Sequence, residues 1–316
     1  MLLIYNSRAG KGSFLTRLPE VIDMFVKGGY RVEVYPTQAA GDAVEKVSQI
    51  PGYISLIVAA GGDGTIDEVV TGLLKSGRDV PLGYIPVGST NDYAASLKLS
   101  FNVLEAVGDI LGGEPQAVDM GEFNNEIFVY VAAFGAFTDV SYRTSQESKN
   151  MLGHLAYLLE GMKALPSLKG WQMSYKSKER SGEGEFLYGM ITNSNSVGGF
   201  GGITGRDVTL NDGVFEVTLI RMPAILAVEA PGILTALLNG GENKNVVTFK
   251  TSKLEVWFDE DVSWTRDGEY GGDHRHLVIE NLPKALSIIV PDPEKEHPLP
   301  QRENAQLNDS LRQLSI

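Results

Sequence analysis

The sequence predicts an α/β fold in two parts: an N-terminal doubly wound α/β domain and a C-terminal antiparallel β-sandwich. Three observations support this prediction. Strand-like and helical patterns alternate through the first third of the chain. After about residue 120, strand-like segments are separated by turn signals. Gly-rich loops follow the early strands, and a length of 316 residues suits two domains.

The first part alternates strand and helix and is placed at residues 1–120. Its strands are near-continuous apolar runs, which are typical of a parallel sheet covered on both faces. Ligands of such sheets bind beyond the carboxyl ends of the strands. The expected strands cover residues 2–5, 31–35, 54–59 and 82–85, and the expected helices cover residues 14–27, 42–49 and 68–75.

The second part is expected to be β-rich and to span residues 121–283. A return segment of about 284–316 would rejoin the first domain, with a strand at 285–290. An exposed strand edge could pair with a second copy and give a homodimer. The spacing of Leu307, Leu311 and Leu314 fits a terminal helix or a frayed tail equally. The expected strands cover residues 127–133, 171–176, 186–193, 215–220, 245–251 and 254–258, and the expected helices cover residues 152–165 and 225–238.

Composition excludes several classes of function. A net charge of −13 argues against nucleic-acid binding. The chain has no Cys, which removes disulfides and thiolate chemistry, and its four His residues are scattered. With no secretory signal and no apolar run long enough to span a bilayer, a cytoplasmic protein is expected. A locally basic stretch at residues 143–180 could face phospholipid head groups, or be a solvated helix and hairpin.

The most informative stretch is Ala-Gly-Gly-Asp-Gly-Thr at residues 60–65, directly after an apolar run. This pattern predicts a strand, a tight loop and a helix N-terminus, which together present backbone N–H groups to one point. Glycine lets the backbone approach a phosphate closely. Asp63 would be repelled by phosphate unless a divalent cation lies between them. The loop therefore suggests a nucleotide with Mg²⁺, with a plain turn as the alternative.

Four further segments carry chemistry. Residues 6–12 offer an amide, glycines and a lysine after the first strand, and residues 86–92 offer hydroxyls, an amide and a carboxylate after the fourth. Asp119 lies at the domain junction, where it could instead staple the two domains. Residues 267–269 read Asp-Gly-Glu, and the Asp-Gly pair is also typical of a hairpin turn. Asp67 reads as a solvated helix position.

These motifs, in this order, resemble the diacylglycerol kinase catalytic family, which includes bacterial lipid kinases and sphingosine kinases. The resemblance covers nearly the whole chain and is strongest to a soluble bacterial diacylglycerol kinase. It departs from the family at Ser7, where proline is commoner, and before the Asn-Asp-Gly turn. The matching motifs are Asn-x-x-x-Gly-Lys, Gly-Gly-Asp-Gly-Thr-x-x-Glu, Pro-x-Gly-Ser-Thr-Asn-Asp, Val-Asp-x-Gly, Asn-Asp-Gly and Asp-Gly-Glu.

The resemblance implies ATP as the phosphate donor and Mg²⁺ as the metal. Asp63, Asp92 and Asp119 would form an acidic network that holds the catalytic Mg²⁺ partly through water, and Glu269 would be the general base. A structural Mg²⁺ would be held by Asp212 and the carbonyls of Thr209 and Val214. The implied nucleotide-binding residues are Asn6, Ser7, Arg8, Ala9, Gly10, Lys11, Thr37, Gly61, Gly62, Gly64, Thr65, Glu68, Gly88, Ser89, Thr90 and Asn91.

The resemblance therefore implies a peripheral lipid kinase that works transiently at the inner face of the membrane. It would convert diacylglycerol to phosphatidic acid, with the lipid acceptor bound by the second part of the chain. The acceptor stays open, because a sphingoid base, a monoacylglycerol or undecaprenol would need only a different cleft shape. NAD kinase is a rival, since it shares Gly-Gly-Asp-Gly-Thr. A nucleotide-binding regulator without turnover is the alternative from another class.

Overall fold

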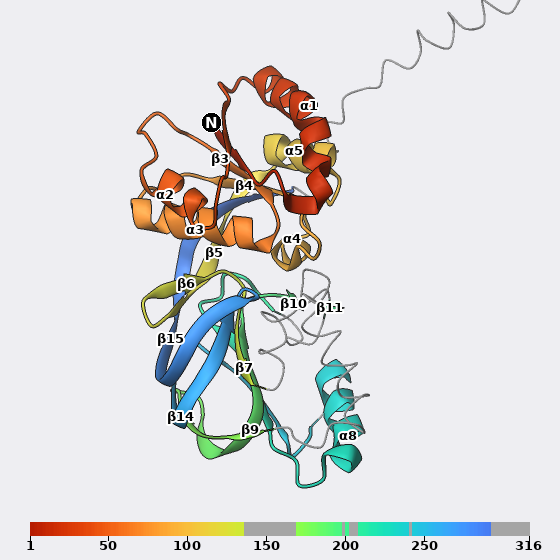
Figure 1. Ribbon diagram of the computed structural model, residues 1–316, viewed down its shortest axis with the longest axis vertical. Coiled ribbons are helices and arrows are strands. Elements are labelled where there is room, and N and C mark those ends of the chain that lie inside the picture. Colours follow the sequence, from red (N-terminus) through yellow and green to blue (C-terminus); the bar gives the residue numbers. More distant parts are fainter. Residues whose placement is uncertain (136–168, 198–199, 202–207, 240–241, 292–316) are drawn as a thin grey trace, which may run out of the picture.

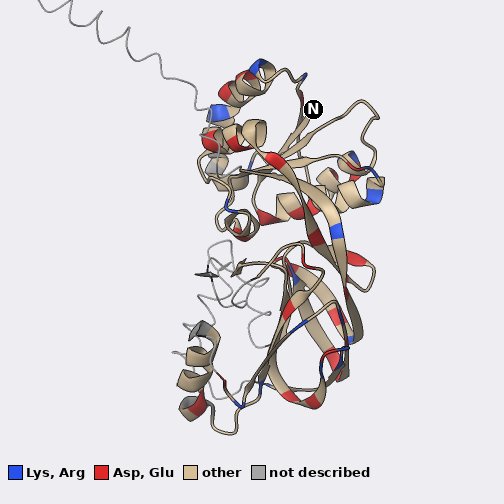
Figure 2. Ribbon diagram, turned by 180° about the vertical axis from the view of Figure 1, so that it is seen from behind, with Lys and Arg blue, Asp and Glu red and all other residues tan. Residues whose placement is uncertain are grey.

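The computed structural model describes residues 1–135, 169–197, 200–201, 208–239 and 242–291. An α/β part and a strand-rich part lie at opposite ends of an elongated molecule (Figure 1). Two long antiparallel strands, β5 (Glu114–Phe123) and β15 (Glu269–Val290), run through both parts. Acidic side chains are spread over both parts of this chain, whose net charge is −13 (Figure 2).

The α/β part is built on four parallel strands in the order β2-β1-β3-β4. The end of β15 continues this sheet beside β4, with Ile288 paired to Leu82. The expected strand at 285–290 is therefore the last part of a much longer strand. The bounds are β1 (Leu2–Tyr5), β2 (Glu33–Pro36), β3 (Ile57–Gly61) and β4 (Leu82–Pro86).

Both faces of this sheet are buried, which explains the continuous apolar strands. Alternate residues point to opposite faces of a strand, so Leu3 and Val58 pack in one core while Ile4 and Ala59 pack in another. Helices α1 (Ser13–Lys27) and α5 (Val103–Gly112) cover the first face. Helices α2 (Asp42–Ser48) and α3 (Asp63–Ser76) cover the second.

Three elements of this part were not predicted: β5, α5 and the short helix α4 (Asp92–Ser96). For α5 the sequence does carry a signal. The Asn102 side chain accepts hydrogen bonds from the amides of Leu104 and Glu105, at 3.0 and 3.3 Å, which is an N-cap.

The strand-rich part is antiparallel, and its ladders close on themselves. Strands β9 and β14 are long, and each pairs with β7 over one half and with β8 over the other. Aromatic side chains such as Trp264 and Phe134 fill the interior, with ring centroids 4.9 Å apart. The bounds are β6 (Glu126–Phe128), β7 (Val131–Gly135), β8 (Trp171–Lys176), β9 (Ser181–Thr192), β12 (Phe215–Arg221), β13 (Val246–Thr251) and β14 (Lys253–Arg266).

The remaining elements are the two-stranded pair β10 (Ser196–Val197) and β11 (Phe200–Gly201), and helix α8 (Leu226–Asn239). The single strand expected at 127–133 is wrong, because β6 ends at Phe128 and β7 begins at Val131. The helix expected at 152–165, most of the basic stretch at 143–180 and the terminal leucines lie outside the described residues.

Candidate active site

The predicted nucleotide-binding segments meet at the carboxyl ends of the parallel strands. The amide of Asn6 donates to the Ala60 carbonyl at 3.0 Å, and the amide of Thr37 donates to the Tyr5 carbonyl at 2.9 Å. Thr37 also directs its hydroxyl at that carbonyl, at 3.5 Å. The ends of β1, β2 and β3 are thus joined directly, as parallel topology requires.

The first loop turns sharply into a 3-10 helix, η1 (Ala9–Gly12). Asn6 shapes this turn, because its side-chain oxygen accepts from the Arg8 amide at 2.9 Å and its carbonyl accepts from the Ala9 amide at 3.2 Å. Gly10 and Gly12 have positive φ of 55° and 76°. The backbone of residues 6–12, which includes Ser7 and Lys11, is therefore folded next to the other loops.

The Gly-Gly-Asp-Gly-Thr segment forms the predicted strand, loop and helix. Gly61 ends β3, Gly62 is the N-cap of α3, and no side chain caps this N-terminus. The amide of Thr65 donates back to the Gly62 carbonyl at 2.9 Å. A Cβ added to Gly64 would meet nothing within 4 Å. The positive end of α3 is thus open at Gly64, which suits an anion.

The second Gly-rich loop packs directly on the first. A Cβ on Gly88 would lie 2.4 Å from the Gly62 Cα, so this contact requires glycine. Asn91 holds the loop, accepting from the Gly88 amide and donating to the Gly88 carbonyl, both at 2.9 Å. Asn91 is buried with φ 55°, whereas Ser89 is exposed and Thr90 half-buried. The Asn91 side chain therefore shapes the loop from inside.

Two predicted metal-binding carboxylates lie at neighbouring helix N-termini. Asp63 begins α3 and accepts a hydrogen bond from the Tyr93 amide of α4 at 3.4 Å. Burial and the charge of Asp92 raise the pKa of Asp63 to about 6, although amides at the start of α4 oppose this. Asp92 is buried and accepts from the Ser196 hydroxyl at 2.8 Å. The sequence analysis missed Ser196, whose partner is over 100 residues away.

This pair fits a hydrated Mg²⁺. Two acidic groups that repel each other in a partly buried site are stabilised by a divalent cation. Among the described residues, no group of three His, Cys, Asp or Glu side chains could hold a metal ion together. Mg²⁺ usually retains waters and takes substrate phosphates as ligands, so a site with only two carboxylates suits it better than a closed protein cage.

Asp119 is fully buried between the two parts, and backbone amides from both parts bind its carboxylate. One oxygen accepts from the Lys284 amide at 2.7 Å and the other from the Gly213 amide at 2.6 Å. The Asp119 carbonyl accepts from the Asn193 side chain at 2.8 Å. Asp119 therefore links strand β5 both to strand β15 and to the turn that precedes β12. We call this arrangement the clasp. A role in a metal network stays a prediction.

At the expected structural metal site, a lysine approaches the carboxylate. The Lys250 ammonium lies 3.5 Å from Asp212 and 2.9 Å from Glu216, and these two acids raise the pKa of Lys250 against the effect of burial. Asp212 also accepts from the Val214 amide at 3.3 Å. A protein cation already compensates Asp212, so Mg²⁺ binding there by Thr209, Asp212 and Val214 also stays a prediction.

Glu68 binds the protein rather than facing the loop. Its carboxylate accepts from the amides of Gly41 and Ala43 at 2.8 and 3.2 Å. It therefore caps the N-terminus of α2 from α3. A direct contact of Glu68 with nucleotide stays a prediction.

Glu269 begins β15 at the tip of the β14–β15 hairpin, and its side chain is exposed. Asp267 and Gly268 form the two-residue turn, with φ of 48° and 84°, between the paired residues Arg266 and Glu269. This confirms the hairpin reading of Asp-Gly, because such turns need positive φ at both positions. The turn lies against the α/β part.

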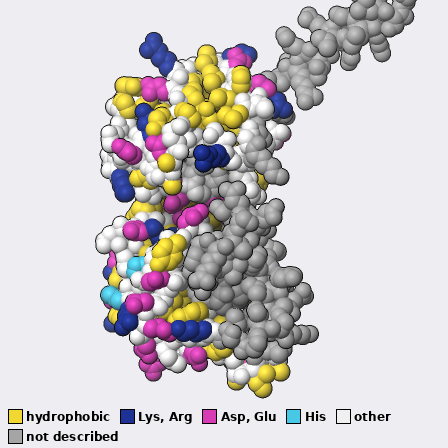
Figure 3. Space-filling model, viewed as in Figure 1, with side chains coloured by type: hydrophobic (Ala, Val, Ile, Leu, Met, Phe, Trp, Pro, Cys, Tyr) yellow, Lys and Arg dark blue, Asp and Glu magenta, His cyan; other side chains and the backbone are white. Residues whose placement is uncertain are grey.

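The prediction for Asp67 is wrong. The sequence analysis placed it on a solvated helix face, but its Oδ1 atom is buried, and its carboxyl group is hydrogen-bonded to Asp267. Helical spacing puts Asp67 on the same side of α3 as Asp63, toward the strand-rich part. That tertiary contact overrides the polarity of the side chain. Acidic side chains are visible at this junction (Figure 3).

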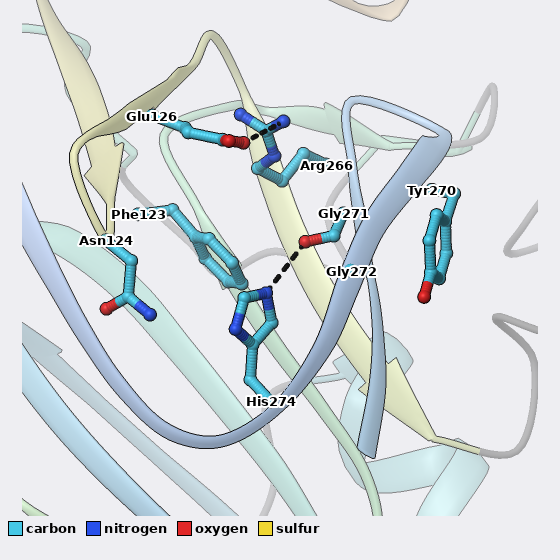
Figure 4. A pocket seen from close by; sticks show the side chains of 8 residues that line it. All are labelled: Phe123, Asn124, Glu126, Arg266, Tyr270, Gly271, Gly272 and His274. Atoms are coloured by element: carbon cyan, nitrogen blue, oxygen red, sulfur yellow. Dashed lines mark hydrogen bonds and ion pairs between the residues drawn. The ribbon is translucent and has the colours of Figure 1, made fainter. Parts of the chain in front are cut away.

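A pocket of about 320 Å³ lies beside the hairpin, lined by residues of β5, β14, β15 and the β5–β6 turn (Figure 4). Arg266 crosses it, donating to the Ile127 carbonyl at 2.9 Å and pairing with Glu126 at 2.5 Å. His274 contacts the Gly271 carbonyl at 2.9 Å. None of the phosphate-loop residues lines this pocket, so it is separate from the nucleotide-binding segments.

Comparisons with known proteins agree with this geometry. The model of the diacylglycerol kinase catalytic domain matches residues 1–123. A diacylglycerol kinase of Bacillus subtilis is 34% identical over 298 residues, covering 93% of this chain and 97% of its own. A diacylglycerol kinase of Staphylococcus carnosus is 33% identical over 304 residues, covering 95% and 98%.

Solved structures share the fold. Two structures described as putative diacylglycerol kinases from Bacillus anthracis superpose with TM-scores of 0.79 and 0.77, at 24% and 21% identity. Both alignments cover 92% of this chain, and they cover 95% and 96% of those chains. The family model covers the phosphate loops and Asp119, and the two curated relatives, at 34% and 33% identity, cover 93% and 95% of the chain. The chain therefore belongs to the diacylglycerol kinase family.

Proposed function

We propose that this chain is an ATP-dependent lipid kinase that transfers the γ-phosphate to the free hydroxyl of diacylglycerol and forms phosphatidic acid. One observation carries the proposal. Strand β15, which begins at Glu269, contacts helix α3, and α3 begins in the glycine loop where the nucleotide segments meet. The curated relatives that match nearly the whole chain are named diacylglycerol kinases. They favour this reading over NAD kinase or a regulator without turnover.

The loops at the ends of β1, β3 and β4 would bind the phosphates of ATP. Gly64 leaves room for close approach, and the start of α3 supplies backbone N–H groups. Asp63 and Asp92 would hold Mg²⁺, which neutralises phosphate charge during transfer. Both carboxylates are fixed from within the protein, by the Tyr93 amide and the Ser196 hydroxyl.

Glu269 would accept the proton of the lipid hydroxyl. An alcohol is a weak nucleophile, so a carboxylate within hydrogen-bonding reach assists its attack on phosphorus. The two-residue turn limits the motion of Glu269, and the side chain is accessible to a large substrate. Phosphoryl transfer otherwise depends on positioning and charge, which the loops provide.

The acceptor is a membrane lipid, so we infer that the protein works peripherally on the inner face of the membrane. Within the described residues, none of the helices has the length and apolar character needed to cross a bilayer. Of the basic residues expected at the lipid surface, Lys169 pairs with Glu260 at 2.7 Å, whereas Lys176 and Lys178 are exposed. A homodimer through a strand edge also remains a proposal.

Transfer of labelled phosphate from ATP to a panel of lipids in mixed micelles tests the function. We expect Mg²⁺-dependent labelling of diacylglycerol above that of sphingosine, a monoacylglycerol or undecaprenol. Labelling of NAD, or of none of these acceptors, would contradict the proposal.

The variant Glu269→Gln tests the base. We expect turnover to fall by about 10²-fold or more, because the amide cannot accept the hydroxyl proton. The Michaelis constant for ATP should change little. Asp261→Asn is the matched control, since Asp261 is an exposed carboxylate on β14 that pairs only at the surface with Arg275, at 3.1 Å. Turnover of Glu269→Gln equal to that of the control would remove Glu269 from the mechanism.

A further inference from the structure

Two buried carboxyl groups meet where the α/β part contacts the catalytic hairpin. Asp67 projects from α3, one turn after Asp63, and Asp267 forms the turn two residues before Glu269. The two groups are hydrogen-bonded to each other, which requires a proton on one of them. No side chain or backbone amide of the described residues donates to the buried Oδ1 atom of Asp67.

The proton belongs to Asp67. Asp267 already accepts three backbone amides of the β6–β7 connection: those of Val129 at 2.6 Å, Tyr130 at 2.9 Å and Val131 at 3.0 Å. Such donors stabilise an ionised carboxylate. They oppose the effect of burial on the pKa of Asp267, whereas burial and the charge of Asp267 raise the pKa of Asp67 well above its ordinary value.

The other charged groups around the pair do not replace this proton. Arg266 favours an ionised Asp67 electrostatically, but its guanidinium is bonded to Glu126 and the Ile127 carbonyl. Glu68 acts in the opposite sense and raises the pKa of Asp67. On the Asp267 side, the phenols of Tyr93 and Tyr130 are buried and stay neutral, because burial raises the pKa of each. Losing the proton would leave two adjacent buried carboxylates.

We propose that Asp67 is a positioning residue for phosphoryl transfer: as a neutral carboxylic acid it donates a hydrogen bond to Asp267 and fixes the Glu269 turn against helix α3. The idea rests on the proposed function, since it concerns the distance between Glu269 and the phosphate loop. The phosphate loop at Asp63 lies one turn of α3 before Asp67. Glu269 lies two residues after Asp267. The Asp67–Asp267 contact therefore connects the loop to Glu269. When Asp67 ionises, repulsion from Asp267 separates the two anchors.

The variant Asp67→Asn separates this role from a merely structural one, because an amide donates the same hydrogen bond at every pH. Turnover of the wild type should decline as the pH rises and Asp67 loses its proton, while Asp67→Asn should retain its turnover over the same pH range. Asp67→Leu fills the space without a donor, so its turnover should fall about 10-fold or more at every pH with little change in the KM for ATP. Asp79→Asn, on an exposed loop, is the control and should follow the wild type.

A readout without turnover keeps this inference distinct from the proposed function. The infrared band of protonated carboxyl groups at neutral pH should be as strong in Asp79→Asn as in the wild type and weaker in Asp67→Asn. If the wild type phosphorylates no lipid while this band behaves as expected, the proposed function fails and the shared proton stands. A band as strong in Asp67→Asn as in the wild type would overturn the inference. So would an Asp67→Asn pH profile identical to that of the wild type, or turnover as low as that of Asp67→Leu.

Discussion

The carboxylate of Asp63 lies in an unfavourable place for a charge: partly buried and close to Asp92. Its pKa, raised from 3.8 to about 6, means that folding favours the protonated form. The contribution of this group to stability is present at acidic pH and is lost as pH rises through about 6. The metal-free protein should thus hold unfavourable electrostatic energy at neutral pH, which Mg²⁺ binding would relieve.

Asp63→Asn should therefore stabilise the metal-free protein at pH 7 while removing activity. The gain over wild type should be small near pH 4, grow through pH 6 and reach at most about 3 kcal/mol. Denaturant unfolding at several pH values, with chelator present, measures it. Equal unfolding free energies for the two proteins at pH 7 would show that the charge is not destabilising.

At this scale the sequence predicts residue types better than their partners. Asp63, Asp92 and Glu269 could be selected as candidates because they lie in motifs beside strand ends. Asp67 and Glu68 could not, since helical spacing does not reveal that one faces a hairpin about 200 residues away and the other caps a neighbouring helix. The Asn91 side chain likewise folds back on its own loop.

At the scale of elements, α2 and α3 are coupled by one side chain. Helix α2 begins after Gly41 with no side-chain cap of its own, and its first amides are satisfied by Glu68 of α3. A short helix depends strongly on such a cap because few of its amides have intrahelical partners. Glu68 thereby connects the nucleotide loop to the outer layer of the α/β part.

Glu68→Ala should lower the free energy of unfolding by about 1 kcal/mol, the usual effect of losing a cap. Glu68→Gln should lose less, since its amide oxygen can still accept one of the two bonds. Glu20→Ala is a control with an exposed ion pair to Arg17, expected to cost at most about 0.5 kcal/mol. Chemical denaturation measures these differences in the free energy of unfolding. If the free energy of unfolding falls no more in Glu68→Ala than in Glu20→Ala, the cap does not contribute to stability.

Most elements could be predicted from their hydrophobic period, including the four parallel strands and the helices α1, α2, α3 and α8. The break between β6 and β7 could not, because it arises where Val129 and Tyr130 turn their amides to the distant Asp267. The lengths of strands β14 and β15 could not be predicted from the hydrophobic period either. Their bends and register shifts depend on pairing with several strands, which a local pattern does not contain.

At the scale of the whole molecule, the two parts are joined by continuous strands and by buried polar contacts. Strands β5 and β15 cross the junction, and Asp119 on β5 accepts amides from Lys284 and Gly213. The Asp67–Asp267 contact forms a second link at the hairpin. The relative position of Glu269 and the phosphate loop is thus set by buried contacts.

Asp119→Ala should destabilise the protein by about 2 to 4 kcal/mol, because it leaves two partly buried amides without an acceptor. Asp79→Asn serves as the neutral comparison. Unfolding followed by Trp fluorescence gives the difference, and limited proteolysis should show faster cleavage near the junction. An unfolding free energy within 1 kcal/mol of wild type would refute the clasp role of Asp119.

A structure of the protein with a non-hydrolysable ATP analogue and Mg²⁺ tests the account most directly. We predict that the triphosphate lies on the glycine loop at Gly64, with the metal beside Asp63 and Asp92 and the terminal phosphate facing Glu269. A nucleotide bound away from the carboxyl ends of β1, β3 and β4, or a terminal phosphate directed away from the β14–β15 hairpin, would contradict it.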